Sequence, residues 1–389
     1  MKRIITFLFF VLTFIAPSQP ASAQRHLPAV IASGPFKSGH IQGIAYDKKR
    51  GHLYLSYTTM LVKCDLDGNI LGSVVGLVGH LGDLTFNEKD GRVYGSLEYK
   101  DDVIGRSLLA QGKNHIKGNI PNAFYIAIFD GRKINREGIR PDEDNILTTV
   151  HLGRVLDDYE SSVEGPKLKV RHRLGCSGID GVSLGPKFGK SGGKQYLTVA
   201  YGIYSDPARK DNDYQVLHQY DISNWQELER PLAQSTDMHQ SGPDTPDAEY
   251  FVYTGNTSYG VQNLEYDKEQ KLWWMAVYPG RKPQFPNYPL FAIDGKIGPK
   301  VEPLKGVSYI DKAQILSLQE RIPSLSDPTS GTRGWSFGAG STGFYPVGKD
   351  YYYISFNYST QEGEGSYIRL HRFVGQADKP FKRVKDESR

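Results

Sequence analysis

A short strand-forming unit recurs along this chain, with its copies beginning near residues 42, 82, 180, 262 and 342. In the first copy, four segments rich in Tyr, Leu and Val are separated by turn residues, and the Asp67-Gly68 turn is typical of a β-hairpin. A meander of this kind cannot bury both of its faces alone, so repeated copies predict the blades of a β-propeller. We therefore expect an all-β protein with five four-stranded blades.

The end of the chain constrains how such a ring closes. The fifth unit leaves little sequence for a fourth strand, so we expect residues 29–33 to pair with it, with Val30 near Leu370. A six-bladed ring with an irregular blade within residues 296–332 is the main alternative, and a β-sandwich is the other, although a sandwich does not explain the repetition. The propeller is expected to span residues 24–375, followed by a polar tail over residues 376–389.

The N-terminus has the features of a secretory signal peptide. Lys2 and Arg3 precede an apolar run over residues 4–15, and Ala21-Ser22-Ala23 forms a small-residue cleavage site. The run is short for a membrane span, and no second long apolar run follows. We expect cleavage after Ala23, a periplasmic or secreted location, and no membrane insertion of the mature chain.

Charge and cysteine content exclude other classes. The chain has 47 basic and 43 acidic residues, a formal net charge of +4, which argues against a nucleic-acid partner. Cys64 and Cys176 fall in units that are not adjacent in a five-bladed ring. A disulfide is therefore not expected, although the compartment would permit one.

The repeat also predicts a functional face. In a four-stranded blade, the start of the innermost strand and the link between the second and third strands lie at the same rim. Four of these links are long: residues 99–122, 202–213, 278–287 and 357–366. Long loops on a rigid scaffold are the usual location of recognition and catalysis, so we expect the site on this face.

Polar residues at the starts of the innermost strands are the candidate site. As catalytic acids we expect Asp83, Asp180 and Glu265, and as ligands of Ca²⁺ or another divalent cation Asp83, Asp180 and Asn263. The expected contacts to a polar small molecule or glycan combine strand-start residues with aromatic and basic residues of the loops: His40, Gln42, His80, Tyr201, Tyr204, Gln262, Asn263, Tyr278, Arg281 and Thr342.

In its blade anatomy the chain resembles propellers of the NHL-repeat and gluconolactonase-like families. The latter hold a divalent metal at the channel mouth with Glu, Asn and Asp side chains. The resemblance implies that Asp180 and Asn263 are two of these ligands, whereas Gln42 stands where the family has an early Glu.

Three functional interpretations remain open at this point. The first is an extracytoplasmic hydrolase or lyase acting on a polar, carbohydrate-like substrate. The second is a non-catalytic propeller that binds a glycan or small molecule, and the third is a protein-interaction scaffold. The sequence has no Gly-x-Ser-x-Gly elbow, His-Glu-x-x-His motif, phosphate loop or dinucleotide fingerprint. An enzyme would require at least two titratable groups close to one substrate atom.

Overall fold

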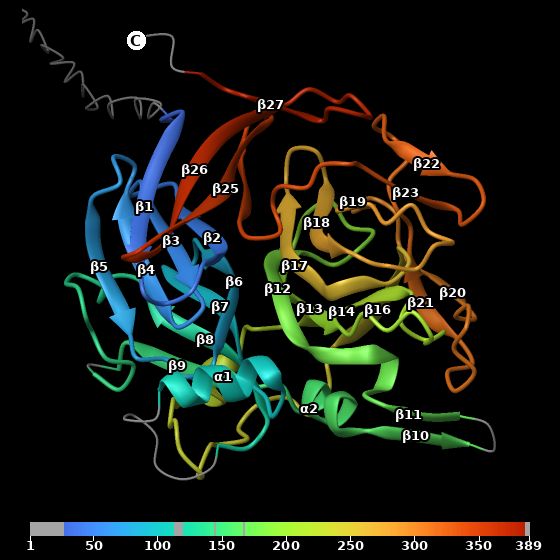
Figure 1. Cartoon of the computed structure of the whole chain (residues 1–389), viewed down its shortest axis with the longest axis horizontal. Coiled ribbons are helices and arrows are strands. Elements are labelled where there is room, and N and C mark those ends of the chain that lie inside the picture. The colour runs from blue at the N-terminus through green and yellow to red at the C-terminus, as the bar shows by residue number, and fades with distance from the viewer. Residues whose placement is uncertain (1–26, 113–119, 144, 166–167, 386–389) are drawn as a thin grey trace, which may run out of the picture.

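The computed structural model describes residues 27–112, 120–143, 145–165 and 168–385, and the expected signal peptide lies outside them. Antiparallel sheets are arranged around a common centre and form a five-bladed β-propeller (Figure 1). The predicted fold class is confirmed, and the six-bladed and sandwich alternatives are wrong.

The first two blades follow the predicted meander closely. The first contains, from the centre outward, β2 (Ile41–Asp47), β3 (His52–Tyr57), β4 (Met60–Asp65) and β5 (Ile70–Val75). The second contains β6 (His80–Asn87), β7 (Arg92–Tyr99), β8 (Ala123–Asp130) and β9 (Leu147–His151), with the short β15 (Arg230–Pro231) at its outer edge.

The third and fourth blades are less regular at their outer edges. The third is ordered β12 (Cys176–Pro186), β13 (Gln195–Ile203), β14 (Tyr214–Tyr220), β16 (Ala248–Tyr253), β21 (Ala313–Leu316) and β20 (Lys300–Glu302). The fourth contains β17 (Thr257–Asp267), β18 (Leu272–Pro279) and β19 (Leu290–Asp294), and isolated bridges from β19 reach Leu318 and Trp335. The hairpin of β22 (Leu325–Asp327) and β23 (Thr332–Gly334) lies beside it. The segment considered for a sixth blade is thus divided between the edges of two existing ones.

The fifth blade joins the two ends of the chain. It contains β24 (Phe344–Gly348), β25 (Tyr351–Thr360), β26 (Gly363–Phe373) and the N-terminal β1 (Val30–Phe36). Val30 pairs with Arg369, next to the residue expected, so the predicted closure is confirmed. The N-terminal β1 pairs with the edge of β26 that would otherwise be left without a partner strand.

The fold continues beyond the predicted boundary at residue 375. Residues 381–383 form β27 (Phe381–Arg383), which pairs with β26. Phe381 is buried, with its ring centroid 5.8 Å from that of Trp274 and 5.5 Å from that of Phe344. Val384 also packs against the core, and its amide donates to the Leu370 carbonyl at 2.9 Å. The polar composition around these two apolar residues conceals them in the sequence, and the strand that contains Phe381 is part of the fifth blade rather than a tail.

Helices occur in the insertions. α1 (Val103–Gln111) lies between β7 and β8, and the Asp102 side chain caps it by accepting a hydrogen bond from the Gly105 amide at 2.8 Å. α2 (Gly153–Glu160) leads into the projecting hairpin of β10 (Ser162–Gly165) and β11 (Leu168–Arg171) (Figure 1). The expected long loop over residues 357–366 is instead mostly ladder, because β25 and β26 stay paired as far as Thr360 and Gly363.

The cores lie within and between the sheets. Trp273 and Trp274 are adjacent in β18, point to opposite faces and are both fully buried. Cys64 and Cys176 are buried free thiols, as expected, and burial raises the pKa of the Cys64 thiol to about 12. Among the described residues, no helix has the length and apolar character needed to cross a membrane.

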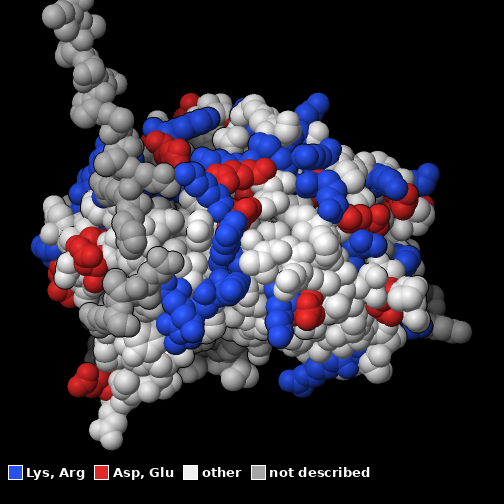
Figure 2. All heavy atoms as spheres, turned by 90° about the horizontal axis from the view of Figure 1, so that it is seen from above, with Lys and Arg blue, Asp and Glu red and all other residues white. Residues whose placement is uncertain are grey.

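Charged side chains of both signs are mixed on the side of the molecule that carries β27 (Figure 2).

Candidate functional site at the channel mouth

The innermost strands β2, β6, β12, β17 and β24 contact one another in sequence around the ring. Aligning their hydrophobic patterns gives two consecutive ring positions. The first contains Gln42, Gly82, Asp180, Gln262 and Thr342, and the second contains Gly43, Asp83, Gly181, Asn263 and Gly343. Asp83 and Asp180 are therefore offset by one residue, although the sequence interpretation treated them as equivalent. Because of this offset, the two side chains point in different directions and make different contacts.

Asp83 connects three blades from inside the ring. It is fully buried and accepts backbone hydrogen bonds from Leu84 at 2.9 Å, Val182 at 3.0 Å and Leu264 at 2.9 Å. These donors belong to β6, β12 and β17 respectively. Both carboxyl oxygens are engaged, so the structure gives Asp83 a role in joining blades.

Asn263 does the same for the remaining blades. Its amide nitrogen donates to the Gln42 carbonyl at 2.7 Å, and its oxygen accepts from the Phe344 amide at 2.9 Å. The glycines at this ring position leave room for the two polar side chains: a Cβ on Gly43 would lie 2.7 Å from Asp83 Oδ1.

Three members of the first ring position, Gln42, Asp180 and Gln262, line a cavity of about 260 Å³ at one mouth of the channel. Besides Ile104 of α1, the cavity is lined by residues within or directly beside β2, β6, β7, β12, β13, β17 and β18: His40, Gln42, His80, Glu98, Lys100, Ser177, Asp180, Gly202, Tyr259, Gln262 and Tyr278. Four of the innermost strands have an irregular register at this level, which brings consecutive residues toward the centre.

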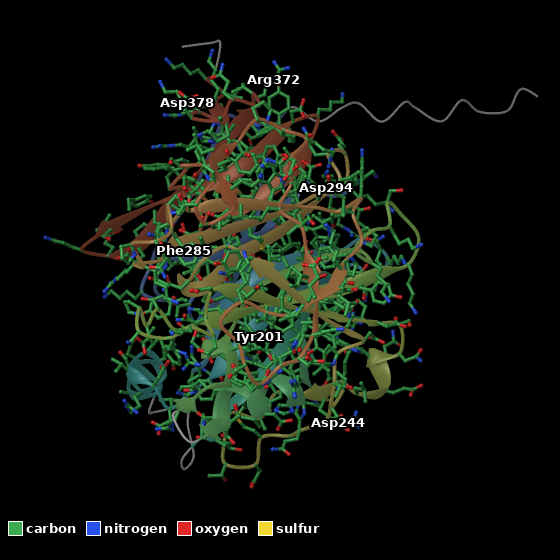
Figure 3. All side chains as sticks on the ribbon, turned by 90° about the vertical axis from the view of Figure 1, so that its right-hand side faces the viewer. Tyr201, Asp244, Phe285, Asp294, Arg372 and Asp378 are labelled. Atoms are coloured by element: carbon green, nitrogen blue, oxygen red, sulfur yellow. The ribbon has the colours of Figure 1, made fainter. Side chains whose placement is uncertain are left out.

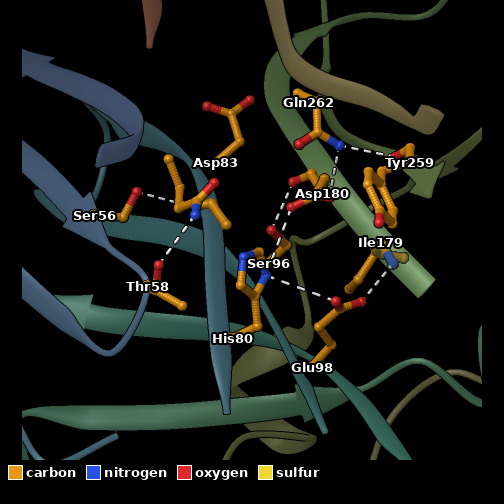
Figure 4. Close-up of polar contacts among 12 residues, drawn as sticks. Ser56, Thr58, His80, Asp83, Ser96, Glu98, Ile179, Asp180, Tyr259 and Gln262 are labelled. Carbon is orange, nitrogen blue, oxygen red and sulfur yellow. Dashed lines mark hydrogen bonds and ion pairs between the residues drawn. The ribbon is translucent and has the colours of Figure 1, made fainter. Parts of the chain in front are cut away.

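Asp180 is the acidic group that ring position one contributes to this cavity. Its backbone carbonyl accepts a hydrogen bond from Ser96 at 2.6 Å, and its carboxyl group accepts one from Gln262 Nε2 at 2.9 Å (Figure 4). Burial, reinforced by the negative charge of Glu98, holds the pKa of Asp180 well above its usual range. Burial therefore favours the protonated form of Asp180, which is the form that can donate a proton.

His80 lies between two acids. Its Nδ1 is 3.6 Å from Glu98 Oε1 and 3.8 Å from Asp180 Oδ1, and this buried nitrogen makes no hydrogen bond among the described residues (Figure 4). Burial, together with the charge of Lys100, lowers the pKa of His80 to about 3. The imidazole is consequently neutral at physiological pH.

A buried ion pair forms the wall behind His80. Lys100 Nζ is 2.5 Å from Glu98 Oε1 and donates to the Ser177 carbonyl at 2.8 Å, while Glu98 Oε2 accepts from the Ile179 amide at 3.0 Å. Burial alone would lower the pKa of Lys100, but the carboxylates of Glu98 and Asp102 outweigh it and hold this pKa above its ordinary value. Lys100 thus stays charged.

Tyr259 borders the cavity in a strained conformation. Its φ is +64°, which is unusual for an aromatic residue, and the residue is 45% exposed. The Tyr259 carbonyl accepts from the same Gln262 Nε2 that donates to Asp180, at 2.8 Å. The strain therefore places an exposed ring beside the acid that Gln262 orients.

The structure brings some of the predicted contacts together and separates others. His40, Gln42, His80, Gln262 and Tyr278 line the mouth cavity with Asp180. Tyr204 and Arg281 line an adjoining groove of about 430 Å³.

Tyr201 and Thr342 lie apart from this cavity lining. Tyr201 is in the packed interior, where its hydroxyl donates to Asp158 at 2.8 Å (Figure 3). Thr342 bonds Ser355 at 2.9 Å.

Glu265 lies toward the other end of the channel. Together with Thr85, Ser183 and Tyr345 it lines a separate cavity of about 350 Å³. Its Oε1 is buried without a hydrogen-bond partner among the described residues, and burial raises the pKa of Glu265 well above its ordinary value. Glu265 and Asp180 therefore do not share one cavity.

The expected metal ligands do not form a cation site with one another. Asp83 and Asn263 direct their oxygens to backbone amides, so neither offers free oxygens beside Asp180. Within the part of the chain that the structure describes, no group of three or more His, Cys, Asp or Glu side chains could hold a metal ion.

Glu98, Lys100 and Tyr259 are site residues that the candidate set omitted. Glu98 and Lys100 are two residues apart at the end of β7 and so point the same way. The signal available in the sequence was a charged pair at the end of a second strand, at the rim already assigned to the site.

Comparisons with known proteins add little to this geometry. No protein-family model and no curated protein matches the chain. A GH43 β-1,3-galactosidase solved with galactodeoxynojirimycin shows a TM-score of 0.40 and 14% identity, covering 91% of this chain and 99% of that one. A calcium-binding regucalcin from Agrobacterium tumefaciens gives 0.31 and 12%, covering 90% and 95%.

A protein of unknown function from Bacteroides caccae gives a TM-score of 0.28 and 11% identity, covering 71% of this chain and 81% of that one. At such distances the likenesses say nothing about ligand or activity, and the propeller architecture rests on the five sheets themselves. The resemblance to NHL-repeat and gluconolactonase-like families stays a prediction.

Proposed function

We propose that this propeller is a hydrolase or lyase acting on a polar, carbohydrate-like substrate in the mouth cavity. The observation that carries the proposal is the placement of His80 Nδ1 at 3.6 Å from Glu98 and 3.8 Å from Asp180 within one cavity. A binding propeller needs no such group of titratable side chains, whereas acid–base catalysis does.

The proton inventory gives each group a role. Asp180, whose protonated form burial favours, gives its proton to the leaving oxygen as the bond to carbon breaks. Neutral His80 accepts a proton, from water in a hydrolysis or from a substrate carbon in an elimination. The Glu98 carboxylate, which Lys100 and the Ile179 amide hold in place 3.6 Å from Nδ1, offsets part of the cost that burial and the charge of Lys100 place on the resulting imidazolium.

The surrounding groups fit a hydroxyl-rich ligand. Gln42 and Gln262 offer amide groups, and Tyr259 and Tyr278 offer ring faces with polar ends. The exposed ring of Tyr259 would equally serve a non-catalytic glycan binder, so the test separates binding from turnover.

The test is turnover of a panel of soluble polysaccharides and their oligomers by the mature chain. Hydrolysis is measured from the reducing ends that it releases. Elimination of uronates is measured from the ultraviolet absorbance of the unsaturated product. We expect Asp180→Asn to lower kcat by at least about a hundredfold while binding and thermal stability are largely retained. Binding without turnover of any panel member would favour the non-catalytic propeller, and neither binding nor turnover would overturn the proposal.

Glu227→Gln is a matched control, because Glu227 is an exposed acid in a loop 3₁₀ turn away from the cavity lining. It should leave turnover unchanged.

We also propose an extracytoplasmic location, supported by the signal-like N-terminal sequence. N-terminal sequencing of the mature protein should begin at Gln24. A cytoplasmic protein that retains Met1 would contradict this.

A further inference from the structure

The mouth cavity continues into two neighbouring cavities. It shares Ile104 and Tyr259 with a groove of about 430 Å³, which in turn shares Asp102, Val103 and Tyr204 with another of about 480 Å³. The three cavities therefore adjoin one another in a row that runs from the channel mouth past α1 to α2.

Aromatic rings follow this path. Tyr278 and Tyr259 line its start, and further out the ring of His172 lies 5.0 Å from Tyr204 and 4.8 Å from Tyr159, centroid to centroid. Rings with a polar end suit the alternating apolar and hydroxyl faces of sugars.

The path is closed at its inner end. Asp83 and Asn263 are fully buried below the mouth and connect the innermost strands of all five blades. A chain-like ligand therefore cannot pass through the channel and must present an end to Asp180 and His80. The mouth cavity, at about 260 Å³, is smaller than the range of roughly 300–1,000 Å³ typical of sites for drug-sized molecules.

We propose that the mouth cavity is the terminal subsite of this extended groove, and that the ligand is a linear oligosaccharide bound end-first, with roughly one unit in each cavity. The inference rests on the proposed carbohydrate-like ligand of the mouth and specifies its length and direction. It implies an enzyme that acts at chain ends rather than in the middle of a polymer.

The test uses glucose and galacturonate oligomers, each from monomer to hexamer, as binding probes for the mature chain in calorimetric titration. Affinity should rise from monomer to about the trimer and then level off, because longer chains extend beyond the groove. Tyr204→Ala should weaken binding of the trimer by about five- to tenfold and leave the monomer unaffected, while Tyr204→Phe keeps the ring and the affinity. Tyr367→Ala removes an exposed aromatic residue of β26, outside the groove, and should change nothing.

The outcomes separate this inference from the proposed function. If monomer and hexamer bind equally and Tyr204→Ala has no effect, while Asp180→Asn abolishes turnover, the groove is not a binding site and the mouth assignment stands. If no oligomer of either series binds, both proposals are overturned. Release of internal fragments from a polymer, rather than terminal units, would contradict the end-first mode.

Discussion

Asp83 and Asn263 together form side-chain hydrogen bonds to the backbones of all five innermost strands of the propeller. The Asp83 carboxyl group accepts from backbone amides of β6, β12 and β17, and the Asn263 amide joins β17 to β2 and β24. All five blades are therefore held at the centre by two side chains that meet on β17. Both occupy the second ring position, one residue away from the position that faces the mouth.

Replacing Asp83 should destabilise the protein strongly. Asp83→Ala leaves three buried backbone N–H groups without acceptors, and we expect the free energy of unfolding to fall by roughly 3–6 kcal/mol. Urea unfolding measures the loss. Asp101→Ala, whose side chain is 77% exposed, is the control and should stay within about 0.5 kcal/mol of the parent. A stable Asp83→Ala variant that loses ligand binding would instead restore Asp83 to the site.

The neighbours Asn263 and Gln262 should respond in opposite ways. Asn263→Ala removes hydrogen bonds between blades and should lower the free energy of unfolding by about 2–4 kcal/mol. Gln262→Ala removes the amide that donates to Asp180 and should reduce activity with a smaller loss of stability. Thermal melts and turnover of both variants check this, and the reverse pattern would mean that the two ring positions are misassigned.

Removing the Lys100 charge should destabilise the protein through its effect on Glu98. Lys100→Met leaves a buried carboxylate without its counter-ion, which raises the pKa of Glu98 further and should cost about 3–5 kcal/mol of stability. The double variant with Glu98→Gln removes the unpaired charge and should recover much of the loss. A double-mutant cycle by urea unfolding gives the coupling energy, and additive losses would show that the pair is not coupled.

His80 should make the protein less stable in acid. Because the pKa of His80 is lowered to about 3 in the folded protein, its contribution is fully present above the unfolded value near 6.5 and is lost as pH falls toward 3. Between pH 6.5 and pH 5 the loss should reach about 1.6 kcal/mol. His151, with a pKa lowered to about 4, acts in the same direction, so the comparison is with His80→Gln, which keeps the His151 contribution. If both proteins lose the same stability over this range, His80 is not the cause.

Phe381 should be required for the fifth blade. Phe381→Ala opens a cavity among Trp274, Phe344 and Tyr352, and should cost about 3–5 kcal/mol. Lys385→Ala, four residues further on, should have no effect on the melting temperature. An unchanged melting temperature for Phe381→Ala would make residues 376–385 a dispensable tail after all.

The sequence alone determined the architecture, because the strands and turns of a blade follow from patterns of neighbouring residues. Strand alternation, hairpin turns and the fivefold recurrence of the unit are all short-range patterns, and the shortage of chain after Tyr367 was enough to indicate that Val30 completes the fifth blade. The rim of the site was accessible for the same reason, since it follows from strand order.

Only the tertiary structure decided which polar residues face the mouth. Asp83 and Asp180 look alike in their repeats, but bulges and a one-residue offset place Asp83 against the amides of neighbouring blades and Asp180 in the cavity. Glu98 and Lys100 became site residues because β7 packs beside β12, a contact between residues about eighty positions apart. The alternation of apolar and polar residues indicates which segments form strands. The direction of a side chain at a bulge, and the neighbour it meets across the ring, depend on packing that no single repeat contains.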